Sequence, residues 1–150
     1  MRGLTPPGEW RRRSVGTVYL DSSVALRTIL DVPERAALQT WMSSTELTCV
    51  SSRLLHTEVT SVLRRDSRPV RDGAALLGCV GHVDITREVR TVAESIERHI
   101  KTLDALHLTT ALLIGESVAV ASHDMTMKVV AENLGLDVVD PVLQARRAVG

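Results

Sequence analysis

Short runs of apolar and β-branched residues alternate along the chain with longer segments in which apolar residues recur every three or four positions. The short runs are typical of buried strands, and the longer segments are typical of helices packed on a sheet. The predicted strands are 15–20, 47–50, 118–121 and 138–139, and 82–85 is a candidate for a further small strand. The predicted helices are 24–30, 36–42, a segment from about 54 to 63, 70–80, 88–99, 102 to just before Gly115, and 125–134.

Strands separated by helices predict parallel pairing, with helices packed on both faces of the sheet. The expected fold is therefore an α/β sandwich with a four- to five-stranded parallel sheet. A chain of 150 residues is long enough for one domain with its own core. We expect this domain to span 15–143, preceded by a loose arm over 1–14 that contains prolines and arginines, and followed by a short tail over 144–150 that frays from Ala145.

Composition removes several classes of protein. Hydrophobic residues make up 44% of the chain and charged residues 24%, which is typical of a folded protein rather than a disordered one. No apolar run approaches the roughly 18 residues of a membrane-spanning helix, and residues 1–14 lack the apolar centre of a signal peptide, so we expect a cytoplasmic protein without a membrane span. Cys49 and Cys79 form no CxxC pair, which argues against a zinc ribbon or a disulfide scaffold. The net charge of zero is lower than that of most nucleic-acid-binding domains.

Four acidic residues are expected at one edge of the sheet. Asp21 directly follows the first predicted strand, and Asp124 follows the strand 118–121. Asp104 lies in the first turn of a predicted helix, and Glu58 lies about one turn into another. Because ligands in parallel sheets bind beyond the carboxyl ends of the strands, these side chains are placed to converge there. Converging carboxylates repel one another unless a cation lies between them, and their oxygens suit hard ions such as Mg²⁺ or Mn²⁺.

Each acid also has a structural interpretation. Asp21 and Asp124 stand where helix N-caps are expected, and Asp104 would stabilise the positive end of its helix. Glu58 would be a solvated residue on a helix face. Ser51 or Ser52, and Asp124, are the predicted caps of the helices that follow them.

Four short motifs give the chain a family resemblance. They read VYLDSS over 18–23, HTEV over 56–59, LDALHL over 103–108 and ASHD over 121–124, the last followed by LGL over 134–136. In this order and spacing, over about 15–142, the chain resembles PIN-domain ribonucleases, specifically the VapC-type toxins of type II toxin–antitoxin pairs. The resemblance implies a PIN-like α/β/α sandwich. It also implies a catalytic quartet of Asp21, Glu58, Asp104 and Asp124 that binds Mg²⁺ or Mn²⁺, with hydroxyl groups beside the metal site at Ser23 and Ser122.

The same resemblance implies a reaction and its partners. The activity would be endonucleolytic hydrolysis of RNA, held inactive by a small cognate antitoxin. Homodimers and toxin–antitoxin hetero-oligomers are the implied assemblies. Candidates to hold the RNA backbone are Arg27, Arg64, Arg65 and the arginines at 11–13. His107, one helical turn after Asp104, is a candidate to orient that carboxylate or the substrate, and the alternative is a hydrogen-bonded packing histidine.

Other functions fit less of the sequence. A catalytically inactive PIN-like module that binds RNA or protein would use the acids only as helix caps. A phosphotransferase of the haloacid dehalogenase type requires a second aspartate two residues after the first, where this chain has Ser23. A two-component receiver domain requires an acidic pair that the chain lacks.

Overall fold

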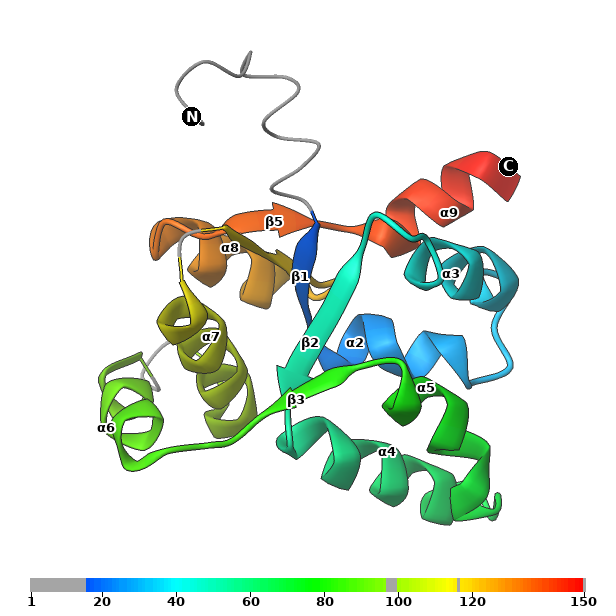
Figure 1. Cartoon of the computed structure of the whole chain (residues 1–150), viewed down its shortest axis with the longest axis horizontal. Helices are drawn as coiled ribbons and strands as arrows, with labels where there is room; N and C mark the ends of the chain where they lie inside the picture. Colours follow the sequence, from blue (N-terminus) through cyan, green and yellow to red (C-terminus); the bar gives the residue numbers. More distant parts are fainter. Residues whose placement is uncertain (1–15, 97–99, 116, 150) are drawn as a thin grey trace.

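A parallel sheet forms the centre of the protein (Figure 1). The computed structural model describes residues 16–96, 100–115 and 117–149. Within them, five strands are arranged in the order β3-β2-β1-β4-β5, and each neighbouring pair is parallel. Their bounds are β1 Thr17–Leu20, β2 Thr48–Ser52, β3 Gly81–Val83, β4 Val118–Ala121 and β5 Asp137–Val139. The predicted parallel α/β architecture is therefore confirmed, with the candidate small strand present as β3.

Helices cover both faces of the sheet, which makes the fold an α/β/α sandwich. On one face lie α6 (Arg87–Ile96), α7 (Thr102–Ile114) and α8 (Met125–Asn133), drawn at the left of Figure 1. The helices of the other face are α2 (Ser22–Ala25), η2 (Leu26–Thr28), α3 (Arg35–Met42), α4 (Leu54–Arg65), η3 (Val70–Gly73), α5 (Ala74–Gly78) and α9 (Pro141–Val149).

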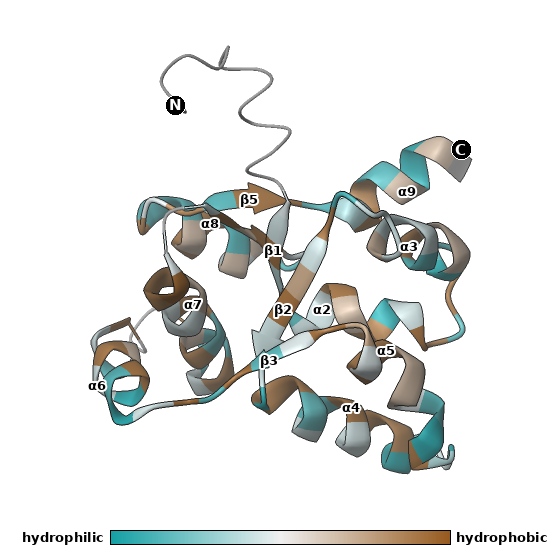
Figure 2. Ribbon diagram, viewed as in Figure 1, coloured by the Kyte–Doolittle hydropathy of each residue, from teal (hydrophilic) through white to brown (hydrophobic). Residues whose placement is uncertain are grey.

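Alternation of side chains along the central strands divides the core into two layers. In β1, Val18 and Leu20 join the cluster under α2–α5, while Tyr19 between them joins the cluster under α7 and α8. In β4, Ala119 and Val120 separate in the same way. Successive residues of a strand point to opposite faces, so a strand that is apolar throughout is buried on both sides. In Figure 2, parts of β2 and β5 are drawn in the brown of hydrophobic residues.

The predicted helix over 70–80 is wrong in its detail. The chain there forms the 3₁₀ turn η3 and the short helix α5, with Gly73 at the junction. A Cβ atom on Gly73 would lie 2.6 Å from the Cγ1 atom of Val59. The close approach of this segment to α4 therefore requires glycine, and close packing replaces the regular helix with a tighter turn.

The prediction of a frayed end from Ala145 is also wrong for residues 145–149, which belong to α9. The helix begins with Asp140 followed by Pro141, and the Asp140 Oδ1 atom accepts the Leu143 backbone N–H at 3.0 Å. An N-cap aspartate followed by proline at the first helical position is a standard helix start.

The predicted arm over 1–14 lies outside the described residues, as do positions 97–99 of the predicted helix 88–99. Across the three described segments, no helix has both the length and the apolar character needed to cross a membrane.

Candidate functional site

The four predicted acids come from elements that meet at the carboxyl edge of the sheet. Asp21 follows β1 and Asp124 follows β4, and these strands are paired in register at Leu20 and Ala121. Glu58 lies in α4, the helix that follows β2, and Asp104 lies in the first turn of α7. The parallel arrangement thus gives the edge placement that the sequence predicts.

Asp21 is fixed by two hydroxyl groups. It is only 2% exposed, and its Oδ2 atom accepts hydrogen bonds from Ser23 at 2.7 Å and Ser122 at 2.8 Å. Each serine hydroxyl in turn accepts a backbone N–H, from His123 and Asp124 respectively. A hydroxyl has one proton to donate, so both serines are committed to orienting this carboxylate.

The helix-cap interpretation holds for one of these aspartates and not for the other. Asp124 accepts the Met127 backbone N–H at 2.9 Å through Oδ1, so it caps α8 as predicted. Asp21 occupies the N-cap position of α2 but makes no side-chain cap bond, so its expected capping role is wrong. For α4, the N-cap position is Arg53 rather than either serine, although the Ser52 hydroxyl accepts the Leu54 N–H at 3.2 Å.

Glu58 is held by a buried histidine. Its Oε1 atom lies 2.6 Å from Nε2 of His107, whose Nδ1 atom lies 2.6 Å from the hydroxyl of Tyr19. Both ring nitrogens of His107 are therefore engaged, and neither bonds Asp104. Tyr19 is the only tyrosine of the chain, and sequence reasoning missed it as a site residue. The signal was present, because a tyrosine in a fully buried strand requires a polar partner for its hydroxyl.

The charges of the other three acids act on Asp104. Burial raises the pKa of its carboxyl above the ordinary value, and the negative charges of Asp21, Asp124 and Glu58 raise it further, while His107 lowers it. Repulsion from three separate elements of the fold requires that these elements present their charges to one region. A carboxylate in such surroundings binds either a proton or a cation more tightly than an isolated one.

The donor chemistry of the site fits a hard divalent cation. One oxygen each of Asp21, Asp124 and Glu58 is occupied by an internal hydrogen bond, and within the described part of the chain their second oxygens and the Asp104 carboxylate have no hydrogen-bond donor. Oxygen ligands of this kind suit Mg²⁺ and Mn²⁺. In residues 16–96, 100–115 and 117–149, however, no three His, Cys, Asp or Glu side chains are already grouped to hold an ion. Metal binding at this edge would therefore require the carboxylates to draw together.

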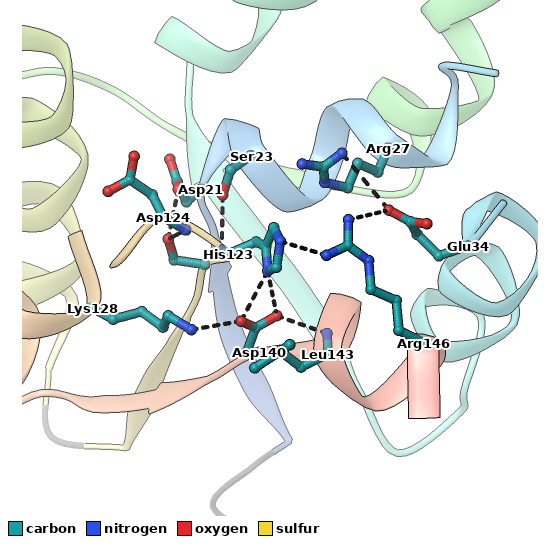
Figure 3. A network of polar contacts seen from close by, with 11 residues as sticks. Asp21, Ser23, Arg27, Glu34, His123, Asp124, Lys128, Asp140, Leu143 and Arg146 are labelled. Carbon is teal, nitrogen blue, oxygen red and sulfur yellow. Dashed lines mark hydrogen bonds and ion pairs between the residues drawn. The ribbon is translucent and has the colours of Figure 1, made fainter. Parts of the chain in front are cut away.

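A second polar network adjoins the site and connects it to α9 (Figure 3). The Oδ2 atom of Asp140 accepts a hydrogen bond from Nζ of Lys128 at 2.6 Å and lies 3.0 Å from Nδ1 of His123. Burial by itself would raise the pKa of Asp140, but its hydrogen bonds from Lys128, the Leu143 N–H and His123 together lower the pKa below the ordinary value. His123 therefore turns its ring toward α9 while its backbone N–H supports Ser23. The sequence analysis did not single out Asp140 and Lys128.

The predicted RNA-contacting arginines lie in different surroundings. Arg27 is 3.7 Å from the buried carboxylate of Glu34, which also lies 3.4 Å from Arg146 of α9 (Figure 3). Arg64 and Arg65 end α4, about 9–10 Å along the helix axis from Glu58 at about 1.5 Å rise per residue. The structure therefore engages Arg27 with Glu34 and leaves Arg64 and Arg65 at the end of α4 farther from the sheet edge.

Comparisons with known proteins agree with this geometry. The sequence is 29% identical over 132 residues to Ribonuclease VapC46 of Mycobacterium tuberculosis (strain ATCC 25618 / H37Rv), an alignment that covers 85% of this chain and 99% of that protein. The fold is similar to that of a chain in a solved toxin-antitoxin complex from Klebsiella pneumoniae, with a TM-score of 0.61, 16% identity, and coverage of 83% of this chain and 97% of that one. The family model of the PIN domain matches residues 18–133, from β1 to the end of α8. The protein therefore belongs to the PIN domain family.

Proposed function

We propose that this protein is an endoribonuclease toxin that hydrolyses RNA with Mg²⁺ or Mn²⁺ and is neutralised by a cognate antitoxin. The observation that carries the proposal is the placement of four acidic residues from separate elements at one edge of the sheet, where Asp21, Asp124 and Glu58 add to the effect of burial in raising the pKa of Asp104. Membership of the PIN domain family supports it, as do a relative named as a ribonuclease and a structural neighbour solved as a toxin-antitoxin complex.

The residues have distinct tasks in this proposal. Asp21, Glu58, Asp104 and Asp124 hold the cation, and Ser23 and Ser122 keep the Asp21 carboxylate in one orientation. When bound, the cation lowers the pKa of a coordinated water and neutralises charge that builds on the phosphate. Without a cation, the four acids repel the RNA backbone, so the bound ion reverses the sign of the local field.

Contact with RNA rests on the cationic side chains around the edge. Arg27 and Arg146 share the buried charge of Glu34, which leaves a net positive group beside the site. Phosphate contacts of this kind position a nucleic acid without reading its sequence. Arg64 and Arg65, and the arginines at 11–13, remain proposed contacts for parts of the RNA farther from the reaction.

Protein partners complete the proposal. A cognate antitoxin would cover the acidic edge, and its cationic side chains would take the place of the metal charge. A homodimer is supported by apolar side chains that remain exposed on two neighbouring helices, Leu113 and Ile114 of α7 and Met125 and Val129 of α8, the last two being 69% and 48% exposed. Figure 2 shows the end of α7 in brown. Exposed apolar side chains on neighbouring helices are surface that a protein contact would bury.

Cleavage of RNA by the antitoxin-free protein tests the proposal. We expect cleavage with Mg²⁺ or Mn²⁺, none with EDTA, and none by Asp104→Asn with metal. The control is Asp137→Asn, which neutralises an exposed aspartate on β5 and should cleave as wild type does. Undiminished cleavage by Asp104→Asn, or cleavage in EDTA, would contradict the proposed reaction. Metal binding without cleavage of any RNA would instead favour an inactive binding module.

A further inference from the structure

A buried chain of hydrogen bonds connects the middle of the sheet to Glu58. It begins at the Ser52 backbone N–H, which donates to the Tyr19 hydroxyl at 3.1 Å. It continues from Tyr19 to Nδ1 of His107 and from Nε2 of His107 to Oε1 of Glu58, each over 2.6 Å. Tyr19 and His107 are both fully buried, whereas the Glu58 side chain is 17% exposed. These hydrogen bonds thus run from the buried core to the Glu58 carboxylate at the solvent-exposed edge.

The direction of these hydrogen bonds follows from the available donors. The Tyr19 oxygen accepts the Ser52 N–H, and its own proton is free to be donated to Nδ1 of His107. The imidazole then carries its proton on Nε2, where it donates to a carboxylate that can only accept. Burial raises the pKa of Tyr19 to about 12, against the smaller opposing effect of its hydrogen bonds, so the phenol keeps the proton that this arrangement needs.

We propose that Tyr19 and His107 are positioning residues that fix the rotamer of Glu58, so that Oε1 is held by Nε2 of the imidazole and Oε2 is left for the cation. This inference rests on the proposed metal-dependent function. A glutamate side chain has several rotatable bonds, and α4 offers it no other hydrogen-bond partner in the described residues. The T-shaped contact of the two rings, at 5.6 Å between centroids and 68° between planes, holds the imidazole in turn.

Substitutions within the chain separate positioning from packing. His107→Leu fills the buried space with an apolar side chain but removes the hydrogen-bond donor to Glu58. His107→Gln supplies an amide N–H that can donate to the Glu58 carboxylate. Tyr19→Phe keeps the ring and removes only the hydroxyl that orients His107. Thr109→Val is the matched control, because Thr109 is equally buried in α7 and its hydroxyl has no hydrogen-bond partner among the described residues. Thermal melting checks that each variant is folded.

The readouts are Mn²⁺ affinity by calorimetry and the ring tautomer of His107 by ¹⁵N NMR. We expect the NMR spectrum to show a protonated Nε2 and an unprotonated Nδ1 in wild type. His107→Leu should bind Mn²⁺ about 10–100-fold more weakly, as is typical when the hydrogen-bond partner of a metal ligand is removed. His107→Gln should recover most of this loss, Tyr19→Phe should show part of it, and Thr109→Val should show none.

Three results would overturn the inference. They are wild-type Mn²⁺ affinity in folded His107→Leu, loss of affinity in His107→Gln equal to that in His107→Leu, and a protonated Nδ1 in wild type. If His107→Leu does not fold, His107→Gln and Tyr19→Phe test the inference in its place. Wild-type Mn²⁺ affinity in Tyr19→Phe would contradict the role of Tyr19 in positioning His107 and Glu58. Failure of wild type itself to bind Mn²⁺ would overturn the proposed function and, with it, the positioning role, whereas the other results leave the function intact.

Discussion

The interaction of Asp140 with its surroundings predicts a large effect on stability. Its side chain is 10% exposed, pairs with Lys128 at 2.6 Å and caps α9 through the Leu143 N–H. A hydrogen bond to a charged group contributes about 1.5–3 kcal/mol, and an N-cap contributes about 1 kcal/mol. Asp140→Ala removes both and leaves the Lys128 ammonium, whose side chain is 15% exposed, without this partner, so we expect a loss of about 2.5–4 kcal/mol. In a chain of this length that corresponds to a melting temperature lower by roughly 10 °C.

The comparison of Asp140→Ala with Asp140→Asn separates the two contributions. Asparagine caps helices about as well as aspartate, so Asp140→Asn should lose only the ion pair, about 2 kcal/mol. Because the pKa of Asp140 is lowered by folding, its contribution is present above the ordinary value of 3.8 and is lost as the pH falls through the folded value. Denaturant unfolding at pH 7 and melting curves down to pH 3 measure these effects, with Asp137→Asn as the control. A loss below about 1 kcal/mol in Asp140→Ala, or a difference between wild type and Asp140→Asn that does not shrink between pH 7 and pH 3, would refute the reasoning.

Two further stability predictions follow from the site and the core. Folding raises the pKa of Asp104, so the metal-free folded state binds its proton more tightly than the unfolded chain, and stability falls as the pH rises from 3.8 through the raised value. Asp104→Asn should therefore melt at a higher temperature than wild type at pH 7 in EDTA, and a lower melting temperature there would contradict the repulsion. Gly73→Ala should destabilise the fold by about 1–3 kcal/mol in denaturant unfolding, because the added Cβ would lie 2.6 Å from Val59. Gly78→Ala, whose Cβ would meet nothing within 4 Å, is its control, and equal effects of the two would rule out overpacking.

The sequence predicts the sheet well because its strands are recognisable without tertiary information. Residues 18–20 and 118–121 are buried on both faces, which is typical of central parallel strands, and the acids that follow these strands are thereby placed at one edge. The C-terminal helix was missed, although Asp140 followed by Pro141 is a start signal that the sequence contains. The break at Gly73 could not be predicted, because it depends on the close approach of another helix.

The details of the site depend on contacts between distant parts of the chain. Asp21 and Ser122 are separated by 101 positions, and His107 and Glu58 by 49. Helical spacing associates His107 with Asp104 on the same helix, yet both nitrogens of its ring bond other residues. Periodicity places a side chain on a face of an element but does not identify its partner across the core. The placement of the four acids at one edge of the sheet was therefore predictable, and their hydrogen bonds were not.

The most direct test of the account is calorimetric titration of the metal-free protein with Mn²⁺, performed on wild type and on Asp21→Asn. Asp21 is buried and held by two serine hydroxyls, so exchange of one carboxylate oxygen for an amide removes the charge with little change in shape. The account predicts saturable Mn²⁺ binding by wild type and by Asp137→Asn, and its loss in Asp21→Asn. Equal Mn²⁺ affinity in Asp21→Asn and wild type would contradict the claim that these carboxylates form one cation site.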